Sequence, residues 1–175
     1  MKIESTKNIG LIGFMGTGKT SIGQALAKKL GRQFFDTDTL VEIESGKTIT
    51  ELFEDDGESG FREMESKVVR QVCRNESAVI SFGGGVVLSK SNVDTIRDSG
   101  IVVLLCASVE SILKRTAVNN QRPLLNTHDD GIRNRIESLL ESRQKLYDAA
   151  MDFVLDTDEI SVDEAVGIII RRLRT

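Results

Sequence analysis

Residues 13–20, GFMGTGKT, constrain the fold of this chain more than any other stretch. They fit the pattern G-x-x-x-x-G-K-[ST], the P-loop, whose glycines let backbone N–H groups converge on phosphate oxygens. An apolar run, residues 9–12, precedes the loop, and apolar residues at helical spacing follow it: Ile22, Ala25, Leu26 and Leu30. This strand–loop–helix context predicts a nucleoside triphosphate site, because the helix N-terminus adds the positive end of its dipole. The alternative is a glycine-rich turn that binds no ligand.

The residue types of the loop suggest separate roles. Lys19 would bring a positive charge to the β- and γ-phosphates and is a catalytic candidate, and the Thr20 hydroxyl would bind Mg²⁺. We expect ATP to contact a continuous run of residues: Gly16, Thr17, Gly18, Lys19, Thr20 and Ser21. ATP is therefore the expected co-substrate and Mg²⁺ the expected cofactor, although the motif alone does not identify the phosphate acceptor.

Length and charge limit the other possibilities. A chain of 175 residues can bury a substantial core, and we expect one domain over residues 1–175. The net charge of −4, from 23 basic and 27 acidic side chains, gives no electrostatic reason to expect a nucleic acid partner. The longest apolar run, residues 101–107, is too short to span a membrane, and residues 1–8 lack a signal-peptide core. Two cysteines without metal-ligand spacing suit reduced thiols, so we expect a cytoplasmic protein, and we further expect a monomer.

Strand and helix patterns alternate along the chain. Five apolar segments suit strands: residues 9–12, 33–35, 78–82, 101–105 and 153–155. The segments between them carry helical periodicity, so the sequence predicts an α/β fold, a three-layer α/β/α sandwich with a parallel sheet covered on both faces. Loops after the carboxyl ends of parallel strands line the ligand crevice, so residues 13–20, 36–38 and 83–85 should meet at one edge of the sheet.

Two carboxylates, Asp36 and Asp38, follow the second predicted strand. Asp36 is the candidate for the magnesium side of the site, and Asp38 would accept a hydrogen bond or a proton from an attacking hydroxyl. Either residue could instead simply cap the following helix. Asp156 also follows an apolar strand, and the sequence does not exclude it as the magnesium-side carboxylate.

A long polar segment, residues 117–131, separates two predicted helices and contains the one proline of the chain, Pro123. Long polar loops in compact domains are often lids. Arg122 would then reach the γ-phosphate, a contact worth about 10³–10⁵ in rate, and closure would exclude water. A disordered surface loop is the alternative.

Six short motifs occur in the order and spacing of the shikimate kinases, which this chain resembles over roughly residues 8–155. They are G-x-x-G-x-G-K-T, D-T-D, G-F-R-x-x-E, G-G-G, R-P-L-L and R-x-x-L-Y. The resemblance implies a fold of the P-loop NTPase type, related to the nucleoside monophosphate kinases, with a five-stranded parallel sheet of order 2-3-1-4-5. It also implies transfer of the γ-phosphate of ATP to the 3-hydroxyl of shikimate, in the biosynthesis of chorismate and the aromatic amino acids.

The same resemblance implies an acceptor site in which helices at about residues 38–74 take a large part. Asp38 would hold the shikimate hydroxyls and orient or deprotonate the attacking one, and Asp36 would lie near Mg²⁺ and contact it through water. Arg62 and Arg143 would clamp the substrate carboxylate, for which a planar guanidinium is suited. The other implied contacts are an apolar wall from Phe53 and Phe61, support of Arg62 or a hydroxyl by Glu65, and the backbone of Gly83, Gly84 and Gly85, with the Gly84 N–H donating to a hydroxyl.

On the nucleotide side, the resemblance implies that Arg122 is the lid arginine, that Arg115 borders the adenine and that Thr157 lies on the other side of the base. Two alternative functions stay open. Another small-metabolite kinase of similar fold, such as a gluconate kinase, is disfavoured because the arginine pair, G-G-G and D-T-D match the shikimate set together. A non-catalytic nucleotide-binding regulatory module could have lost a catalytic residue, whereas Lys19, Asp38 and Arg122 are all present.

Overall fold

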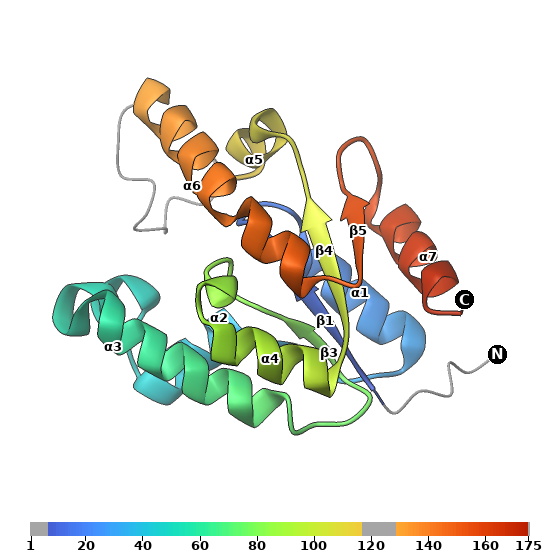
Figure 1. Cartoon of the computed structure of the whole chain (residues 1–175). Helices are drawn as coiled ribbons and strands as arrows, with labels where there is room; N and C mark the ends of the chain where they lie inside the picture. The colour runs from blue at the N-terminus through green and yellow to red at the C-terminus, as the bar shows by residue number, and fades with distance from the viewer. Residues whose placement is uncertain (1–6, 117–128, 175) are drawn as a thin grey trace.

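The sheet of the computed structural model, which describes residues 7–116 and 129–174, has five parallel strands (Figure 1). The strands are β1 (Asn8–Ile12), β2 (Phe34–Asp36), β3 (Val79–Ser81), β4 (Gly100–Cys106) and β5 (Phe153–Asp156). Their order in the sheet is β2-β3-β1-β4-β5, so the order that the resemblance implied is confirmed. Strand β1, which leads into the P-loop, lies at the centre of the sheet between β3 and β4.

Helices cover both faces of the sheet and give the predicted three layers (Figure 1). They are α1 (Lys19–Leu30), α2 (Thr37–Ser45), α3 (Ile49–Val72), α4 (Lys90–Ser99), α5 (Val109–Thr116), α6 (Asp129–Ala150) and α7 (Val162–Arg172), with a short 3₁₀ helix, η1 (Val86–Leu88). Helices α1 and α7 pack on one face of the sheet, and α3, α4 and α6 pack on the other. Among the described residues, no helix is both long enough and apolar enough to span a bilayer.

Alternate side chains of β4 enter two hydrophobic clusters, one on each face of the sheet. Val102 and Leu104 pack in the cluster that also contains residues of α3, α4 and α6. Val103 and Leu105 pack in the cluster that contains residues of α1 and α7. All four side chains are buried, which explains why this strand is a continuous apolar run rather than an alternating pattern.

Residues 49–72 form α3, which consists of two helical segments that meet at a kink at Gly57. Gly57 has φ 69° and ψ −178°, a backbone conformation that residues other than glycine rarely adopt. This break in the helical angles bends the chain at Gly57. The helix begins with a capping box. The Thr48 hydroxyl accepts from the Glu51 N–H at 3.2 Å, and the Glu51 carboxylate accepts from the Thr48 N–H at 2.7 Å.

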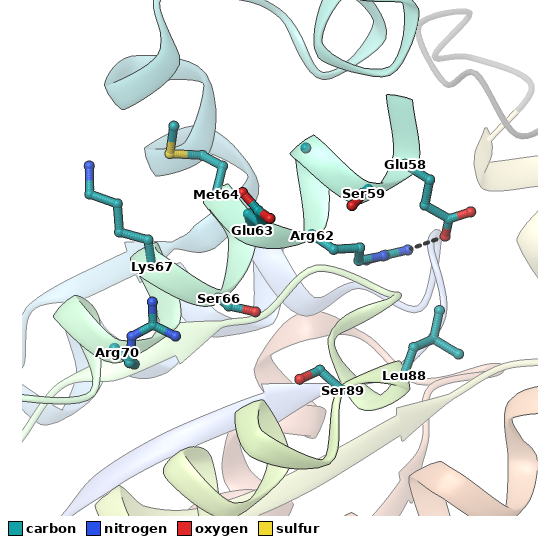
Figure 2. A pocket seen from close by; sticks show the side chains of 11 residues that line it. Glu58, Ser59, Arg62, Glu63, Met64, Ser66, Lys67, Arg70, Leu88 and Ser89 are labelled. Atoms are coloured by element: carbon teal, nitrogen blue, oxygen red, sulfur yellow. Dashed lines mark hydrogen bonds and ion pairs between the residues drawn. The ribbon is translucent and has the colours of Figure 1, made fainter. Parts of the chain in front are cut away.

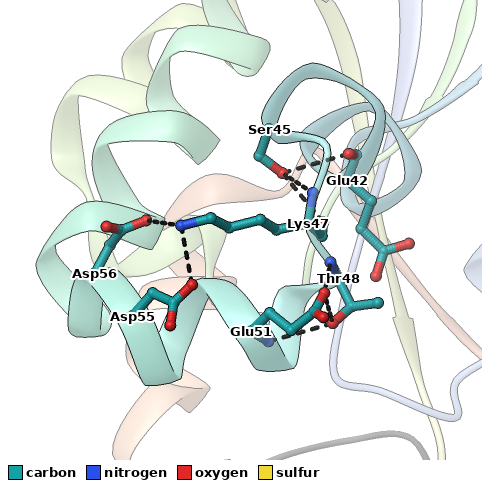
Figure 3. A network of polar contacts seen from close by, with 7 residues as sticks. All are labelled: Glu42, Ser45, Lys47, Thr48, Glu51, Asp55 and Asp56. Carbon is teal, nitrogen blue, oxygen red and sulfur yellow. Dashed lines mark hydrogen bonds and ion pairs between the residues drawn. The ribbon is translucent and has the colours of Figure 1, made fainter.

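A polar network around Lys47 joins the α2–α3 connection to the first turns of α3 (Figure 3). The Nζ atom of Lys47 lies 3.0 Å from Asp55 Oδ2 and 3.3 Å from Asp56 Oδ2. The Lys47 N–H donates to the Ser45 hydroxyl at 3.2 Å. Exposed ion pairs of this kind contribute little to the free energy of folding.

The predicted lid, residues 117–131, has two parts. Residues 117–128, which include Arg122, lie outside the described residues. The end of the predicted lid, residues 129–131, belongs to α6, so the expected boundaries were wrong there: the helix begins at Asp129 rather than at Ile132. Propensity could not reveal this start, because Gly131 in the first turn weakens the helical pattern.

Asn8 offers a test of how the start of β1 is anchored. Its buried side chain donates to Asn75 O at 2.6 Å and accepts from the Ala78 N–H at 2.9 Å. The variant Asn8→Ala should lower the free energy of unfolding by about 1–3 kcal/mol, because the buried Ala78 N–H loses its partner. Urea unfolding would measure the change.

The matched control is Lys90→Ala, which breaks the exposed ion pair with Asp94 at 2.6 Å. This change should alter the free energy of unfolding by no more than about 0.5 kcal/mol. Equal effects of the two substitutions would show that Asn8 does not anchor the strand.

Candidate active site

The P-loop leaves β1 and curls around the side chain of its own lysine. Gly16 and Gly18 have φ angles of 76° and 92°, and Gly18 directly precedes Lys19, the first residue of α1. The Lys19 ammonium donates to the carbonyl oxygens of Gly13 and Phe14, both at 2.9 Å. Left-handed glycines next to a helix N-terminus form nests of N–H groups, and the first turn of α1 carries no acidic residue that would repel a phosphate.

The remaining predicted ATP contacts belong to the same loop and helix start. Thr17 is buried, and its hydroxyl donates to Phe14 O at 2.8 Å, so its side chain supports the loop from within. Ser21 is exposed in the first turn of α1. For Thr17 the part that faces a phosphate would therefore be its backbone N–H.

Asp36 caps a helix and also contacts the P-loop. Its Oδ2 atom accepts a 2.8 Å hydrogen bond from the Thr20 hydroxyl. Its Oδ1 atom caps α2 by accepting from the N–H groups of Asp38 at 3.1 Å and Thr39 at 3.4 Å. Asp156 ends β5, which lies at the opposite edge of the sheet from β2. Asp36 rather than Asp156 is therefore the carboxylate beside Thr20.

The glycine loop, residues 83–85, follows β3 and is held by hydrogen bonds from two helices. On one side, the Thr37 hydroxyl, at the start of α2, accepts from the Gly83 N–H at 2.9 Å. On the other side, two residues of α6 donate to the Gly84 carbonyl oxygen. The hydroxyl of Tyr147 lies 2.6 Å from this oxygen, and Nη1 of Arg143 lies 3.2 Å from it.

Two side chains approach the glycine loop so closely that a Cβ atom on Gly83 or Gly85 would force them to shift, and the P-loop backbone lies in ordinary contact range of Gly84. A Cβ atom on Gly83 would lie 2.5 Å from Asp38 Oδ1. A Cβ atom on Gly84 would lie 3.4 Å from the nearest atom of the P-loop backbone. A Cβ atom on Gly85 would overlap the guanidinium of Arg62. The P-loop, the candidate base and a candidate clamp arginine therefore meet at one loop.

Glu65 is a buried acid close to Arg62 and to the glycine loop. Its Oε2 atom accepts from Arg62 Nη1 at 2.7 Å, and its Oε1 atom has no hydrogen-bond partner among the described residues. Burial raises the pKa of Glu65, the positive charge of Arg62 opposes the rise, and the negative charge of Asp38 adds to it. Glu65 therefore takes up a proton at a higher pH than an exposed glutamate does.

Arg62 is held on several sides but keeps one buried donor without a partner. It forms ion pairs with Glu65 at 2.7 Å and with Glu58 at 3.4 Å. Its Cζ atom lies 5.0 Å from the ring centroid of Phe61, which in turn lies 4.8 Å from the ring of Phe53. Its Nε atom is buried and has no partner within the part of the chain that is described. The predicted apolar wall and clamp arginine are thus neighbours.

Arg115 joins the P-loop to the connection between β5 and α7. Its Nη1 atom donates to Gly16 O at 3.2 Å and to Thr157 Oγ1 at 3.0 Å, and its Nη2 atom donates to Thr157 O at 2.8 Å. Arg115 is exposed, whereas Thr157 is only 3% exposed. The two residues expected on either side of the base are therefore in direct contact, and Arg115 presents the larger surface to a ligand.

A groove of about 880 Å³ runs along α3 beside Leu88 and Ser89 (Figure 2). Arg62 and Ser66 line it, and Figure 2 shows the Arg62 guanidinium reaching Glu58 along its edge. No residue of the P-loop lines this groove, and Arg62 is the only predicted site residue that does. The groove is therefore not the place where the candidate catalytic residues converge.

The structure thus brings together the predicted acceptor residues that it describes, and it adds two residues to which sequence reasoning gave no role. Thr37 is the central residue of D-T-D, and Tyr147 is the last residue of R-x-x-L-Y. The side chains of both residues form hydrogen bonds with the backbone of the glycine loop. The available signal was the spacing of Tyr147 from Arg143, one helical turn, which places both on one face of α6.

Comparison with known proteins shows the family of this chain. The sequence profile of the shikimate kinase family matches residues 15–174. A shikimate kinase of Pelotomaculum thermopropionicum is 44% identical over 168 residues, 96% of each chain. The structure of a shikimate kinase from Acinetobacter baumannii in complex with shikimate has a TM-score of 0.94 at 34% identity, over 98% of this chain and 95% of that one.

A gluconokinase of Sinorhizobium meliloti shares the fold alone. Its TM-score is 0.59 at 17% identity, over 99% of this chain and 94% of that one. The shikimate kinase from Acinetobacter baumannii is twice as similar in sequence, at 34% identity. From its sequence profile and its near full-length relatives, the chain belongs to the shikimate kinase family.

Proposed function

We propose that this chain transfers the γ-phosphate of ATP to the 3-hydroxyl of shikimate, giving shikimate 3-phosphate and ADP. One observation carries the proposal: the glycine loop lies beside the P-loop backbone at Gly84 and beside two arginines at Gly84 and Gly85. A phosphate donor on the first side and a carboxylated acceptor on the second would therefore lie next to each other. Family membership and the shikimate complex of the Acinetobacter baumannii relative support this assignment.

On the donor side, the P-loop N–H groups and Lys19 would hold the ATP phosphates. The Thr20 hydroxyl and the Asp36 carboxylate, which lie 2.8 Å apart, are hard oxygen ligands of the kind that Mg²⁺ prefers. A magnesium ion bound there would neutralise charge on the phosphates. Mg²⁺ commonly keeps several waters and takes only one or two protein ligands, so these two oxygens suffice.

On the acceptor side, Arg62 and Arg143 would bind the shikimate carboxylate. The buried Nε of Arg62, which has no partner among the described residues, supports this role because a carboxylate would supply its missing acceptor. The rings of Phe53 and Phe61 would face the apolar part of the acceptor. The Gly84 N–H would donate to a hydroxyl, and Glu65 Oε1 would accept from one.

In the transfer step, the 3-oxygen of shikimate attacks the γ-phosphorus, and the bond from that phosphorus to the bridging oxygen of ADP breaks. The proton of the 3-hydroxyl passes to Asp38, whose carboxylate borders the glycine loop at Gly83. Arg122, in the proposed lid before α6, would stabilise charge on the transferred group. Arg115 would border the adenine, supported by Thr157.

We further propose that residues 1–175 act as a single domain, as a cytoplasmic monomer, without nucleic acid or membrane partners. The net charge of −4 supports the absence of a nucleic acid partner. The two cysteines, whose thiol pKa values are both raised by burial, are suited to a reduced state.

A coupled assay of ADP release, with ATP and Mg²⁺, tests the function directly. We expect turnover with shikimate and none above background with gluconate or nucleoside monophosphates. Turnover with gluconate would assign the chain to the alternative kinase class. Absence of turnover with every acceptor, despite ATP binding, would favour a non-catalytic regulatory module.

The role of Asp38 as the base is tested by Asp38→Asn. This change should lower kcat by about 10²–10⁴, because the acceptor of the hydroxyl proton is lost, and should leave the Kd for ATP unchanged. The control is Asp55→Asn, a surface carboxylate 3.0 Å from Lys47, which should keep normal turnover. Near-normal kcat in Asp38→Asn would remove Asp38 from the mechanism.

The two contacts of Asp36 can be separated by two substitutions. Asp36→Asn keeps a good helix cap, so urea unfolding should stay within about 0.5 kcal/mol of the native chain, whereas Asp36→Ala should lose about 1 kcal/mol. Both variants should need more Mg²⁺ for half-maximal activity at fixed ATP. An unchanged Mg²⁺ requirement in Asp36→Asn would leave Asp36 with the capping role alone.

A further inference from the structure

Two side chains of α6 donate to one carbonyl oxygen of the glycine loop. The hydroxyl of Tyr147 lies 2.6 Å from Gly84 O, and Nη1 of Arg143 lies 3.2 Å from it. The two residues are one helical turn apart, so both project from the same face of α6. Both are buried, with 3% of Tyr147 and 5% of Arg143 exposed. The Gly84 carbonyl therefore has two donors from one rigid element.

The bond to Gly84 O also determines where another group points. A trans peptide is planar, so the carbonyl of Gly84 and the N–H of Gly85 lie in one plane and point in opposite directions. The preceding peptide is fixed separately, because Gly83 O accepts from the Val86 N–H at 3.0 Å. That bond sets the direction of the Gly84 N–H. Glycine peptides rotate easily, so these external bonds decide the orientation of both N–H groups.

Tyr147 and Arg143 differ in what else they can do. Arg143 makes the longer bond, its Cζ lies 5.8 Å from the ring centroid of Phe14, and it is a proposed ligand of the acceptor carboxylate. Burial raises the pKa of Tyr147 to about 12, against the opposing charge of Arg143, so the phenol stays protonated and donates at every working pH. The ring of Tyr147 is packed in the core with residues of α4 and β4. Tyr147 is therefore the permanent donor to Gly84 O.

We propose that Tyr147 is a positioning residue for the phosphate acceptor: its hydroxyl holds the Gly84–Gly85 peptide so that the Gly85 N–H faces the acceptor. The proposal rests on the proposed function, in which residues 83–85 and Arg143 bind shikimate. Tyr147 leaves Arg143 free to turn toward the carboxylate, because the Gly84 carbonyl keeps a donor when Arg143 moves. The Thr37 hydroxyl holds Gly83 independently, so removal of the phenol should loosen only the second half of the loop.

The variant Tyr147→Phe removes the hydroxyl and keeps the ring that packs in the core. We expect the KM for shikimate to rise about 3- to 10-fold, as loss of one hydrogen bond predicts, with the KM for ATP unchanged. A purely structural defect would lower the amount of folded enzyme and therefore the apparent kcat, without a selective effect on one substrate. A KM for shikimate equal to that of the native chain would overturn the proposal.

A matched control breaks another hydrogen bond of the same helix. Nη1 of Arg97, on α4, donates to Ala149 O at the end of α6 at 2.7 Å, away from the glycine loop. The variant Arg97→Ala should leave the KM for shikimate unchanged even where it lowers the melting temperature. An equal rise of this KM in both variants would show that Tyr147 acts only through the general placement of α6.

A ligand-free measurement separates this proposal from the proposed function. Relaxation dispersion of backbone ¹⁵N signals reports motion on the μs–ms timescale. In Tyr147→Phe, the Gly85 signal should gain exchange broadening, whereas the Gly83 signal and both signals in Arg97→Ala should not. A Gly85 signal without added broadening would overturn the positioning role. This readout needs no substrate, so it is decisive even if the native chain fails to phosphorylate shikimate.

Discussion

The parallel pairing of β1 with β3 is the constraint on which the rest of the site depends. Its register joins Ile9 to Val79 and Leu11 to Ser81, so the two strands end side by side. The P-loop follows β1 and the glycine loop follows β3, and this pairing brings the two loops into contact. Strand β2 pairs with β3 in the same direction and adds the start of α2, which carries the candidate carboxylates, to the same edge. Three loops distant in sequence thus form one site.

A loop made only of glycines cannot fix its own conformation, so the neighbouring elements must do so. Helix α2 supplies Thr37, and α6 supplies Tyr147 and Arg143. The absence of side chains is itself useful, because the Arg62 guanidinium and the Asp38 carboxylate occupy the space where Cβ atoms would lie. Charged groups therefore come within reach of backbone N–H groups, and a small acceptor can contact both at once.

On the acceptor side of the site, opposite charges are paired, but two polar atoms have no hydrogen-bond partner among the described residues. The buried Glu65 pairs through one oxygen with Arg62, which offsets part of the cost of burying both charges. One oxygen of Glu65 and one nitrogen of Arg62 have no partner among the described residues. In the proposed complex, a hydroxyl would donate to the first and a carboxylate would accept from the second. A carboxylated polyol can therefore satisfy both groups, because it carries a hydrogen-bond donor for the first and an acceptor for the second.

The sequence by itself determined the P-loop and the alternation of strands and helices, because each depends on residues within a few positions of one another. The strand order and the acceptor residues came from family resemblance rather than from local pattern. Only the tertiary structure decided that Asp36 rather than Asp156 lies beside Thr20, and that Tyr147 holds Gly84. The Tyr147–Gly84 bond spans 63 positions, and that of Arg143 spans 59. Contacts of this range follow from the order of strands in the sheet, which no local periodicity encodes.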